Sequence, residues 1–153
     1  MGYMIDEVEW SIDKELLQQI RERVFVCELH IPKHVEFDHL DKTAHHVLVT
    51  DESNKCPVAS VRLCNDALIG RIAVLPEHRN RSVYKSLLNY LVGLAEKQGC
   101  DCVSINCILN EVDRFKRNGF SADGLVFMEA GIPRQRMLCP IKQFDTRPFT
   151  LVH

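Results

Sequence analysis

The sequence has no long apolar run and almost no net charge. No 18 consecutive residues are apolar, and the first residues lack the basic and hydrophobic regions of a secretory signal peptide. The 19 basic residues nearly balance the 21 acidic ones, so the formal net charge is only -2. This balance gives no electrostatic reason to expect nucleic acid or an anionic membrane as a partner. We therefore expect a cytoplasmic protein that binds neither.

The sequence also lacks the spacing of a disulfide framework or a metal centre. Its 7 cysteines are odd in number and show no paired spacing, which fits a reduced chain. His30 and His34 follow Cys27, but Pro32 interrupts the helix that would bring the two histidines to one face. No second cysteine pair is spaced for a tetrahedral zinc site. We predict that the protein holds no metal.

The alternation of apolar and polar residues predicts one mixed α/β domain. A chain of 153 residues suffices for one domain with a core and is short for two. Strands are predicted over residues 3–9, 44–50, 58–64, 69–75, 101–107, 125–130 and 134–139. Helices are predicted over residues 11–28, 83–98 and 109–118, with a loosely held tail from about residue 143. This order predicts a mixed central sheet with helices on both faces.

Residues 69–88 combine a short apolar strand, a basic loop and the start of an amphipathic helix. The apolar positions of that helix recur on one face, at Val83, Leu87, Leu91 and Leu94. A helix N-terminus presents unpaired N–H groups and the positive end of the helix dipole. Arg79, Arg81 and Lys85 add three cationic side chains at the same place. The pattern predicts a binding site for a phosphate-bearing ligand.

The basic loop and several other segments resemble one known superfamily. From Arg79 the loop reads Arg-x-x-Ser-x-Tyr, which resembles the acyl-coenzyme A motif of the GNAT N-acyltransferases, Gln/Arg-x-x-Gly-x-Gly/Ala. Ser82 and Tyr84 replace the two glycines. Segments that resemble the small ElaA-like branch follow in the family's order, at residues 24–28, 36–41, 44–46, 69–71, 118–120 and 129–133. The resemblance spans most of the chain and implies the GNAT fold.

The resemblance also implies acetyl-coenzyme A (acetyl-CoA) as the co-substrate. In GNAT enzymes the backbone of the central strand forms hydrogen bonds with the pantetheine arm. By resemblance, the residues that do so here are Ile72, Ala73 and Val74. The pyrophosphate cradle would comprise His78, Arg79, Arg81, Ser82, Val83, Tyr84 and Lys85. The Cβ atoms of Ser82 and Tyr84 limit how closely the phosphates can approach the backbone. Hydrogen bonds from the cationic side chains, about 1.5–3 kcal/mol each, can offset the weaker backbone contacts. Phe115 stands where the family usually has a tyrosine general acid. Because a thiol pKa of about 8.5 makes the thiolate a fair leaving group, this loss is tolerable.

The acceptor side needs a base or a desolvating pocket. An alkyl amine with a pKa of about 10.4 is neutral in roughly one molecule in a thousand near neutral pH. By resemblance, the acidic and histidine residues on this side are Glu28, Glu36, Asp38, Asp41, His46 and Glu129. We predict Glu28 to be the base or the amine anchor, the alternative being a surface carboxylate paired with Arg21 or Arg23. Arg62 and Arg71 either recognise an anionic part of the acceptor or form ion pairs on a strand face. Arg134 stands where the family often has histidine.

Together these features predict an N-acetyltransferase that moves the acetyl group from acetyl-CoA directly to the primary amine of a small molecule. Amino-sugar phosphates such as glucosamine 6-phosphate are candidates, because the acceptor side offers both carboxylates and arginines. The alternative is a CoA-sensing or protein-binding module with little or no activity, since the two glycines and the tyrosine are replaced. The sequence leaves the acceptor and the oligomeric state open, and a homodimer is one option.

Overall fold

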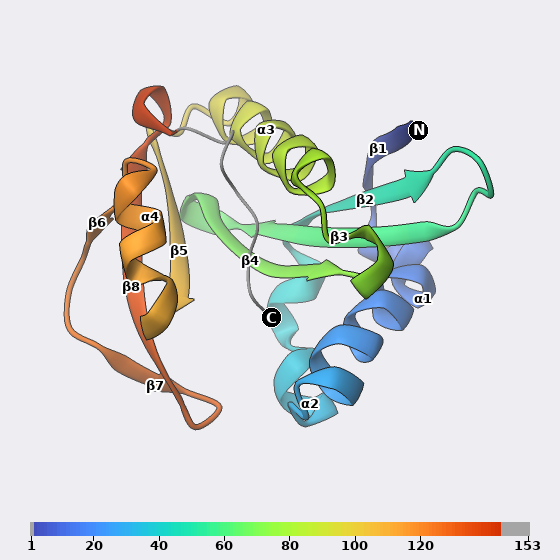
Figure 1. The fold of residues 1–153 in the computed structure, drawn as a ribbon, viewed down its shortest axis with the longest axis horizontal. Coiled ribbons are helices and arrows are strands. Elements are labelled where there is room, and N and C mark those ends of the chain that lie inside the picture. Colours follow the sequence, from blue (N-terminus) through green and yellow to red (C-terminus); the bar gives the residue numbers. More distant parts are fainter. Residues whose placement is uncertain (1, 145–153) are drawn as a thin grey trace.

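A mixed β-sheet organises residues 2–144, the part of the chain that the computed structural model describes (Figure 1). The strands follow the order β1-β2-β3-β4-β5-β8-β6, and β7 also pairs with β8. Neighbours are antiparallel except β4 and β5. The strands are β1 (Tyr3–Val8), β2 (His45–Asp51), β3 (Pro57–Cys64), β4 (Leu68–Val74), β5 (Cys102–Ile108), β6 (Ser121–Ala122), β7 (Phe127–Glu129) and β8 (Ile132–Pro140). The predicted mixed sheet is confirmed, whereas the short β6 was not predicted.

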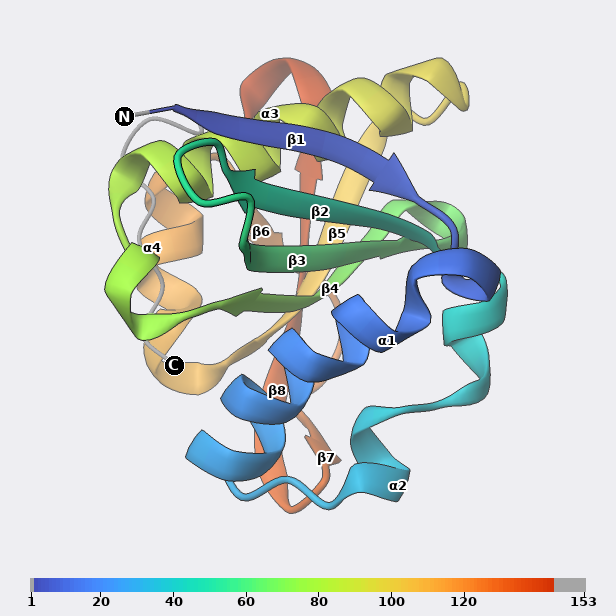
Figure 2. The same ribbon diagram turned by 90° about the vertical axis from the view of Figure 1, so that its right-hand side faces the viewer.

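Helices cover both faces of this sheet, as predicted. α1 (Trp10–Arg21) contacts β3 and β4 on one face, and α3 (Arg81–Lys97) contacts β1, β2 and β3 on the other (Figures 1 and 2). α1 continues as a π-helical turn over Glu22–Glu28. α4 (Val112–Arg117) packs against β6 and β8. The shorter elements are α2 (Lys33–Glu36) and 3₁₀ turns at His39–Lys42, Asn65–Ala67, Pro76–His78, Leu109–Glu111 and Ile141–Gln143.

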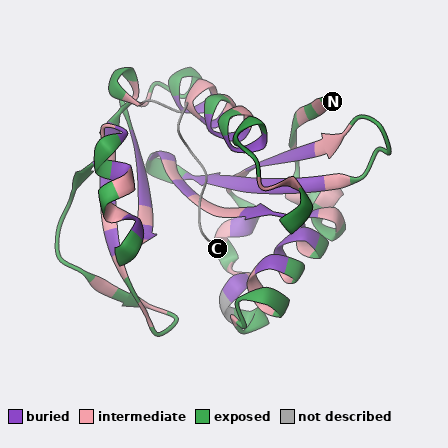
Figure 3. Ribbon diagram, viewed as in Figure 1, coloured by how far each residue is buried: buried purple, intermediate pink, exposed green. Residues whose placement is uncertain are grey.

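Two apolar clusters fix β4 from opposite sides. The larger cluster lies between the sheet and α3, whose buried residues face the strands while its exposed residues face outward (Figure 3). Val74 belongs to this cluster, whereas its neighbour Ala73 belongs to a second cluster with Leu17, Ile20 and Val24 beneath α1. Adjacent residues of a strand point to opposite faces, and each buried aliphatic side chain contributes about 1.5–3 kcal/mol. The end of β4 is therefore held firmly from both faces.

β4 and β5 separate soon after they meet. Their paired residues are Leu68 with Ser104 and Ile69 with Ile105. Farther along β4 the register against β3 shifts at a β-bulge, where Arg71 has a φ of 53°. A bulge bends its strand, and both views show β4 turning away from β5 (Figures 1 and 2). The backbone after Ile69 therefore borders an opening on the β5 side.

Candidate active site

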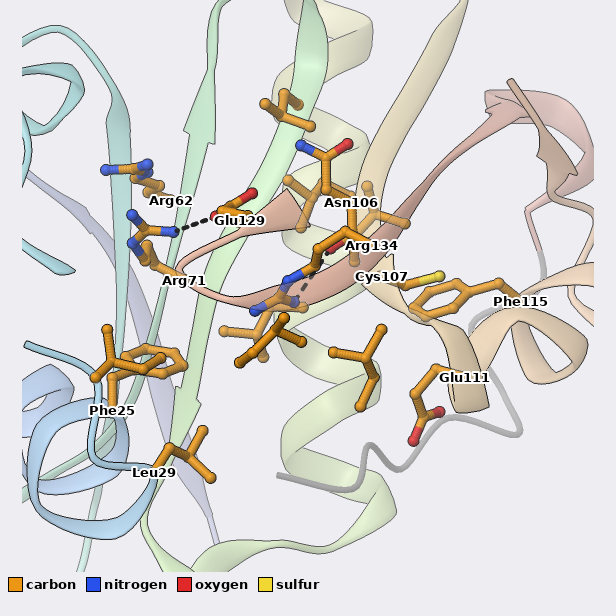
Figure 4. A pocket seen from close by; sticks show the side chains of 18 of the residues that line it. Phe25, Leu29, Arg62, Arg71, Asn106, Cys107, Glu111, Phe115, Glu129 and Arg134 are labelled. Atoms are coloured by element: carbon orange, nitrogen blue, oxygen red, sulfur yellow. Dashed lines mark hydrogen bonds and ion pairs between the residues drawn. The ribbon is translucent and has the colours of Figure 1, made fainter. Parts of the chain in front are cut away.

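A cavity of about 690 Å³ occupies the opening between β4 and β5 (Figure 4). Residues 69–72 of β4 form one wall, and residues 105–111 of β5 and the following turn form the other. The π-helical turn contributes Phe25, and the hairpin of β7 and β8 contributes Glu129 and Arg134. A mostly apolar lining with a few charged groups is typical of sites for small molecules.

The N-terminus of α3 follows β4, as the sequence predicts, but its capping residue is Asn80 rather than Ser82. The Asn80 side-chain oxygen accepts a hydrogen bond from the N–H of Val83 at 3.1 Å, and its carbonyl accepts one from Tyr84 at 3.3 Å. Two of the predicted phosphate donors are thus already used, and the Tyr84 side chain is buried in the core. Within residues 2–144, the N–H groups of Arg81 and Ser82 make no hydrogen bond.

The side chains around this helix start differ in their exposure. Those of Arg81, Ser82 and Lys85 are exposed, as a surface phosphate site requires. His78 instead lies beside β1, with its Nδ1 3.1 Å from the Tyr3 hydroxyl and the two rings packed edge to face. His78 therefore ties the loop to the first strand.

Arg79 and Glu28, predicted for the coenzyme and for base catalysis, bind each other. Arg79 donates from Nη1 and Nη2 to the two Glu28 oxygens at 2.9 and 2.6 Å. Its Nε donates to the carbonyl of Val74 at 2.9 Å. The hydrogen bond to Glu28 raises the pKa of Arg79. This pair joins the π-helical turn to the end of β4, and Glu28 lies outside the cavity lining. Arg23, one of the alternative partners of Glu28, instead lies 3.9 Å from Glu77.

Three arginines and three carboxylates form a cluster behind the cavity, which we call the arginine network: Arg21, Arg62, Arg71, Glu36, Asp38 and Asp41. Arg21, at the end of α1, is 1% exposed. Its Nε donates to Glu36 at 2.8 Å and its Nη1 to Asp41 at 2.7 Å. Its guanidinium also lies 5.7 Å from the ring centre of Trp10 and 5.0 Å from that of Phe37.

Arg62 and Arg71 extend the arginine network into the cavity wall. Arg62 Nη1 donates to Asp38 at 2.7 Å and to Asp41 at 3.0 Å. Arg71 Nη2 donates to Asp38 at 3.1 Å, and its Nε lies 3.3 Å from Glu36. Both guanidinium groups are therefore held by carboxylates that do not line the cavity, and Arg71 Nη1 also lies 3.7 Å from Glu129, which does.

The residues Glu36, Asp38 and Asp41, predicted to contact the acceptor, are not among those that line the cavity. Glu36 and Asp41 are only 2% and 1% exposed, because the arginines hold them inside. Burial raises the pKa of Glu36 despite the nearby arginines. For Asp38, burial is outweighed by the hydrogen bond and charge of Arg62, so its pKa is lowered. All three carboxylates therefore hold the arginines in position, and their contact with the acceptor stays a prediction.

His46 is also buried, at 1% exposure, and does not line the cavity as a residue of the acceptor side was expected to do. Its ring stacks on Trp10 with centroids 5.2 Å apart. Burial lowers the pKa of His46 and favours the neutral ring. Because a carbonyl oxygen only accepts, Nε2–H must donate to the carbonyl of Asp41 at 2.8 Å. His46 therefore supports the segment that carries the network carboxylates.

We expect His46 to make the protein less stable in mild acid. Below the ordinary pKa of 6.5 the unfolded chain binds a proton that the folded state excludes, so stability falls as pH decreases toward the folded pKa. The slope approaches about 1.4 kcal/mol per pH unit within that window. Denaturant unfolding across pH 5–7, followed by circular dichroism, should show this slope in the wild type and lose it in His46→Gln. The control is His45→Gln, because His45 is 43% exposed. An unchanged slope in His46→Gln would contradict this expectation.

The cavity also contains groups that the sequence analysis did not assign, namely Asn106, Cys107 and Glu111. Burial raises the pKa of Cys107 to about 11, which keeps the thiol protonated and unreactive near neutral pH. Phe115, 2% exposed, lines the cavity and packs edge to face on Phe120. A sequence signal for Asn106, Cys107 and Glu111 does exist. Polar residues at the point where a strand leads into a helix indicate a ligand site, because ligands often bind at the carboxyl ends of parallel strands.

A metal centre would be a second possible site within residues 2–144. No group of His, Cys, Asp and Glu side chains there is arranged to hold a metal ion. Each of the 7 cysteines is a free thiol. Over the same residues, no helix combines the length and the hydropathy needed to cross a membrane.

Comparison with known protein families identifies the family of this chain. Residues 14–120, more than half of the chain, match the Acetyltransferase (GNAT) family. The chain belongs to the GNAT acetyltransferase family. GNAT enzymes use acyl-CoA as their co-substrate, so this chain is an acyltransferase. It is 28% identical over 121 residues to the uncharacterized N-acetyltransferase YjcF of Bacillus subtilis (strain 168), covering 78% of this chain and 86% of YjcF.

Solved structures of other GNAT proteins share the fold. An acyl-CoA N-acyltransferase from Pseudomonas aeruginosa superposes with a TM-score of 0.79 at 23% identity, covering 90% of this chain and 99% of that one. Escherichia coli ElaA superposes with a TM-score of 0.74 at 22% identity, with the same coverage of 90% and 99%. The GNAT fold predicted from the sequence is therefore confirmed.

Proposed function

We propose that this GNAT enzyme transfers the acetyl group of acetyl-CoA to the primary amine of a small molecule. The observation that supports this proposal most directly is the cavity at the separation of β4 and β5, which brings open strand backbone together with carboxylate and guanidinium groups. Its volume of about 690 Å³ suits a small acceptor.

The residues on the coenzyme side fit acetyl-CoA. The backbone of Ile72, Ala73 and Val74 lies beyond the paired part of β4 and β5, on the side where the pantetheine arm would bind. The Val74 carbonyl already accepts a hydrogen bond from Arg79 Nε, which leaves Ile72 and Ala73 as the open part of this backbone. The side chains of Ala73 and Val74 are fully buried and hold the strand in place. At the start of α3, the N–H groups of residues 81 and 82 and the cations of Arg79, Arg81 and Lys85 would hold the pyrophosphate.

On the acceptor side, the amine nitrogen attacks the thioester carbonyl carbon, and the C–S bond breaks with its electron pair on sulfur. The proton of the amine passes to a base. We assign this role to Glu129, which lines the cavity, is 37% exposed and lies 3.7 Å from Arg71 Nη1. Glu28 as the base stays a prediction, with less support, because Arg79 holds both of its oxygens. Phe115 has no proton to give, so the thiolate leaves without a tyrosine acid.

Amino-sugar phosphates are the acceptors to test first. Thiol release from acetyl-CoA should be measured with glucosamine 6-phosphate, glucosamine and simple alkyl amines, and mass spectrometry should identify the acetylated product. The expected result is amine-dependent thiol release. Measurable acetyl-CoA binding without release by any amine would instead favour the CoA-sensing module.

We expect the double variant Arg79→Gln, Arg81→Gln to bind CoA about tenfold to a hundredfold more weakly. The expected change corresponds to the loss of roughly one charge-assisted hydrogen bond to phosphate, about 1.5–3 kcal/mol, because Arg79 also donates to Glu28 and to the Val74 carbonyl. Calorimetry with CoA measures the change in Kd. Arg23→Gln is the control, because Arg23 is a 59% exposed arginine on the π-helical turn. Equal Kd values for the double variant and the wild type would show that the pyrophosphate does not bind at this helix start.

A further inference from the structure

Arg134 differs from the other two arginines of the cavity in having no carboxylate partner. Within residues 2–144, Arg62 and Arg71 form ion pairs, and Arg134 forms none. Its Nη1 donates a long hydrogen bond of 3.4 Å to the carbonyl of Asn106. Its Nε is buried and makes no hydrogen bond within the same residues. A partly buried guanidinium with one weak neutral partner has lost hydration without gaining a compensating charge.

The nearby Cys107 thiol does not supply that charge either. Burial raises the pKa of the nearby Cys107 thiol to about 11, so this thiol is neutral near pH 7. In Figure 4 the Arg134 side chain extends into the cavity, toward the side where Arg71 and Glu129 lie. The guanidinium is therefore placed to receive an anion from a molecule bound in the cavity.

The hairpin of β7 and β8 places a carboxylate on the same face as this guanidinium. Phe127 pairs with Arg134 and Glu129 pairs with Ile132, so these four residues share one face of the hairpin. Glu129 and Arg134 are diagonal neighbours on the two strands, and such residues are typically about 7–8 Å apart across the pair. A tight turn joins the strands, with Ala130 and Gly131 both at positive φ, 52° and 76°. Such a turn fixes the register of the pair.

From this arrangement we infer that the acceptor is an amine that also carries an acidic group, a carboxylate or a phosphate, and that Arg134 binds this group. The inference rests on the proposed function and names the substrate class of the same cavity. Glu129 receives the amine end, and Arg134 forms paired hydrogen bonds with the acidic end. Two fixed charges of opposite sign orient such a molecule, whereas an amine without an acidic group uses only one of them.

The experiment compares acceptors that differ only in the acidic group. Glucosamine 6-phosphate is compared with glucosamine, and 4-aminobutyrate with butylamine, in wild type and Arg134→Gln. We expect the wild type to prefer the anionic member of at least one pair by about tenfold to a hundredfold in kcat/KM, which identifies phosphate or carboxylate as the group read. In Arg134→Gln this ratio should fall to about one, mainly through KM. Arg136→Gln is the matched control, since Arg136 lies on the same strand, pairs with Asp123 and does not line the cavity.

Calorimetry with the two anionic amines separates this inference from the proposed function. Binding that is lost in Arg134→Gln but kept in Arg136→Gln supports the anion site even if no amine is acetylated, in which case the proposed function fails alone. Acetylation without preference for either anionic member overturns the inference and leaves the proposed function standing. A preference that persists in Arg134→Gln also overturns it, as does the absence of both binding and turnover.

Discussion

Replacing Arg21 with leucine is expected to lower the free energy of unfolding by about 3–5 kcal/mol, as when one partner of a buried ion pair is removed. The variant leaves Glu36 and Asp41, 2% and 1% exposed, without the guanidinium that donates to both at 2.8 and 2.7 Å. It also removes the cation that lies over Trp10 and Phe37. Denaturant unfolding followed by far-UV circular dichroism measures the loss without relying on the altered surroundings of Trp10.

The control for this prediction is Arg23→Leu, two residues along the chain. Arg23 is 59% exposed and 3.9 Å from Glu77, so its loss should cost less than about 1 kcal/mol. Arg21→Lys keeps the charge but not the planar fork of donors, and an intermediate loss is expected. Equal losses for Arg21→Leu and Arg23→Leu would mean that the arginine network contributes little to stability.

Features with a local pattern were predictable from the sequence. The apolar face of α3 is visible in the sequence because the apolar residues of a buried helix face recur every 3 to 4 positions. The strand before it is visible as a short run of apolar residues. The basic helix start was found in the same way. Arg21 carried a usable signal that was missed: it lies on the apolar stripe of Leu17, Ile20 and Val24, where a charged side chain requires a buried partner.

Features that depend on distant parts of the chain were not predictable. Glu28 and Arg79 are 51 positions apart, and no local pattern shows that they pair. The acidic segment from Glu36 to Asp41 could be located near the site, but the sequence does not show which way its carboxylates point. Their direction depends on Arg62 and Arg71, whose positions depend on the bulge in β4. Sequence similarity therefore grouped these charged residues but could not show which of them pair with one another.

Glu129→Gln is expected to lower kcat by about 10²–10⁴-fold, the usual contribution of a general base. Most of the amine is protonated near neutral pH, so removing its proton is the demanding step, and glutamine cannot accept that proton. Glu129 is suited to the task because it lines the cavity and, within residues 2–144, forms only one ion pair, the long one of 3.7 Å to Arg71. The measurement is kcat against pH with a saturating amine. The acidic limb of this profile should be lost or moved in the variant, while the KM for acetyl-CoA stays close to the wild-type value.

Two companion variants decide which carboxylate and which step matter. Glu28→Gln breaks the paired hydrogen bonds to Arg79, so it should act mainly on the KM for acetyl-CoA and leave the acidic limb in place. Phe115→Tyr adds a phenol at the family's acid position and should change kcat by less than about tenfold, roughly 1.4 kcal/mol in barrier, because the thiolate is already a fair leaving group. If Glu28→Gln instead removed the acidic limb and Glu129→Gln did not, the base would be Glu28, and Arg79 would have to release it before each turnover. A gain of several hundredfold in Phe115→Tyr would show that departure of the thiolate, rather than deprotonation of the amine, limits the natural enzyme.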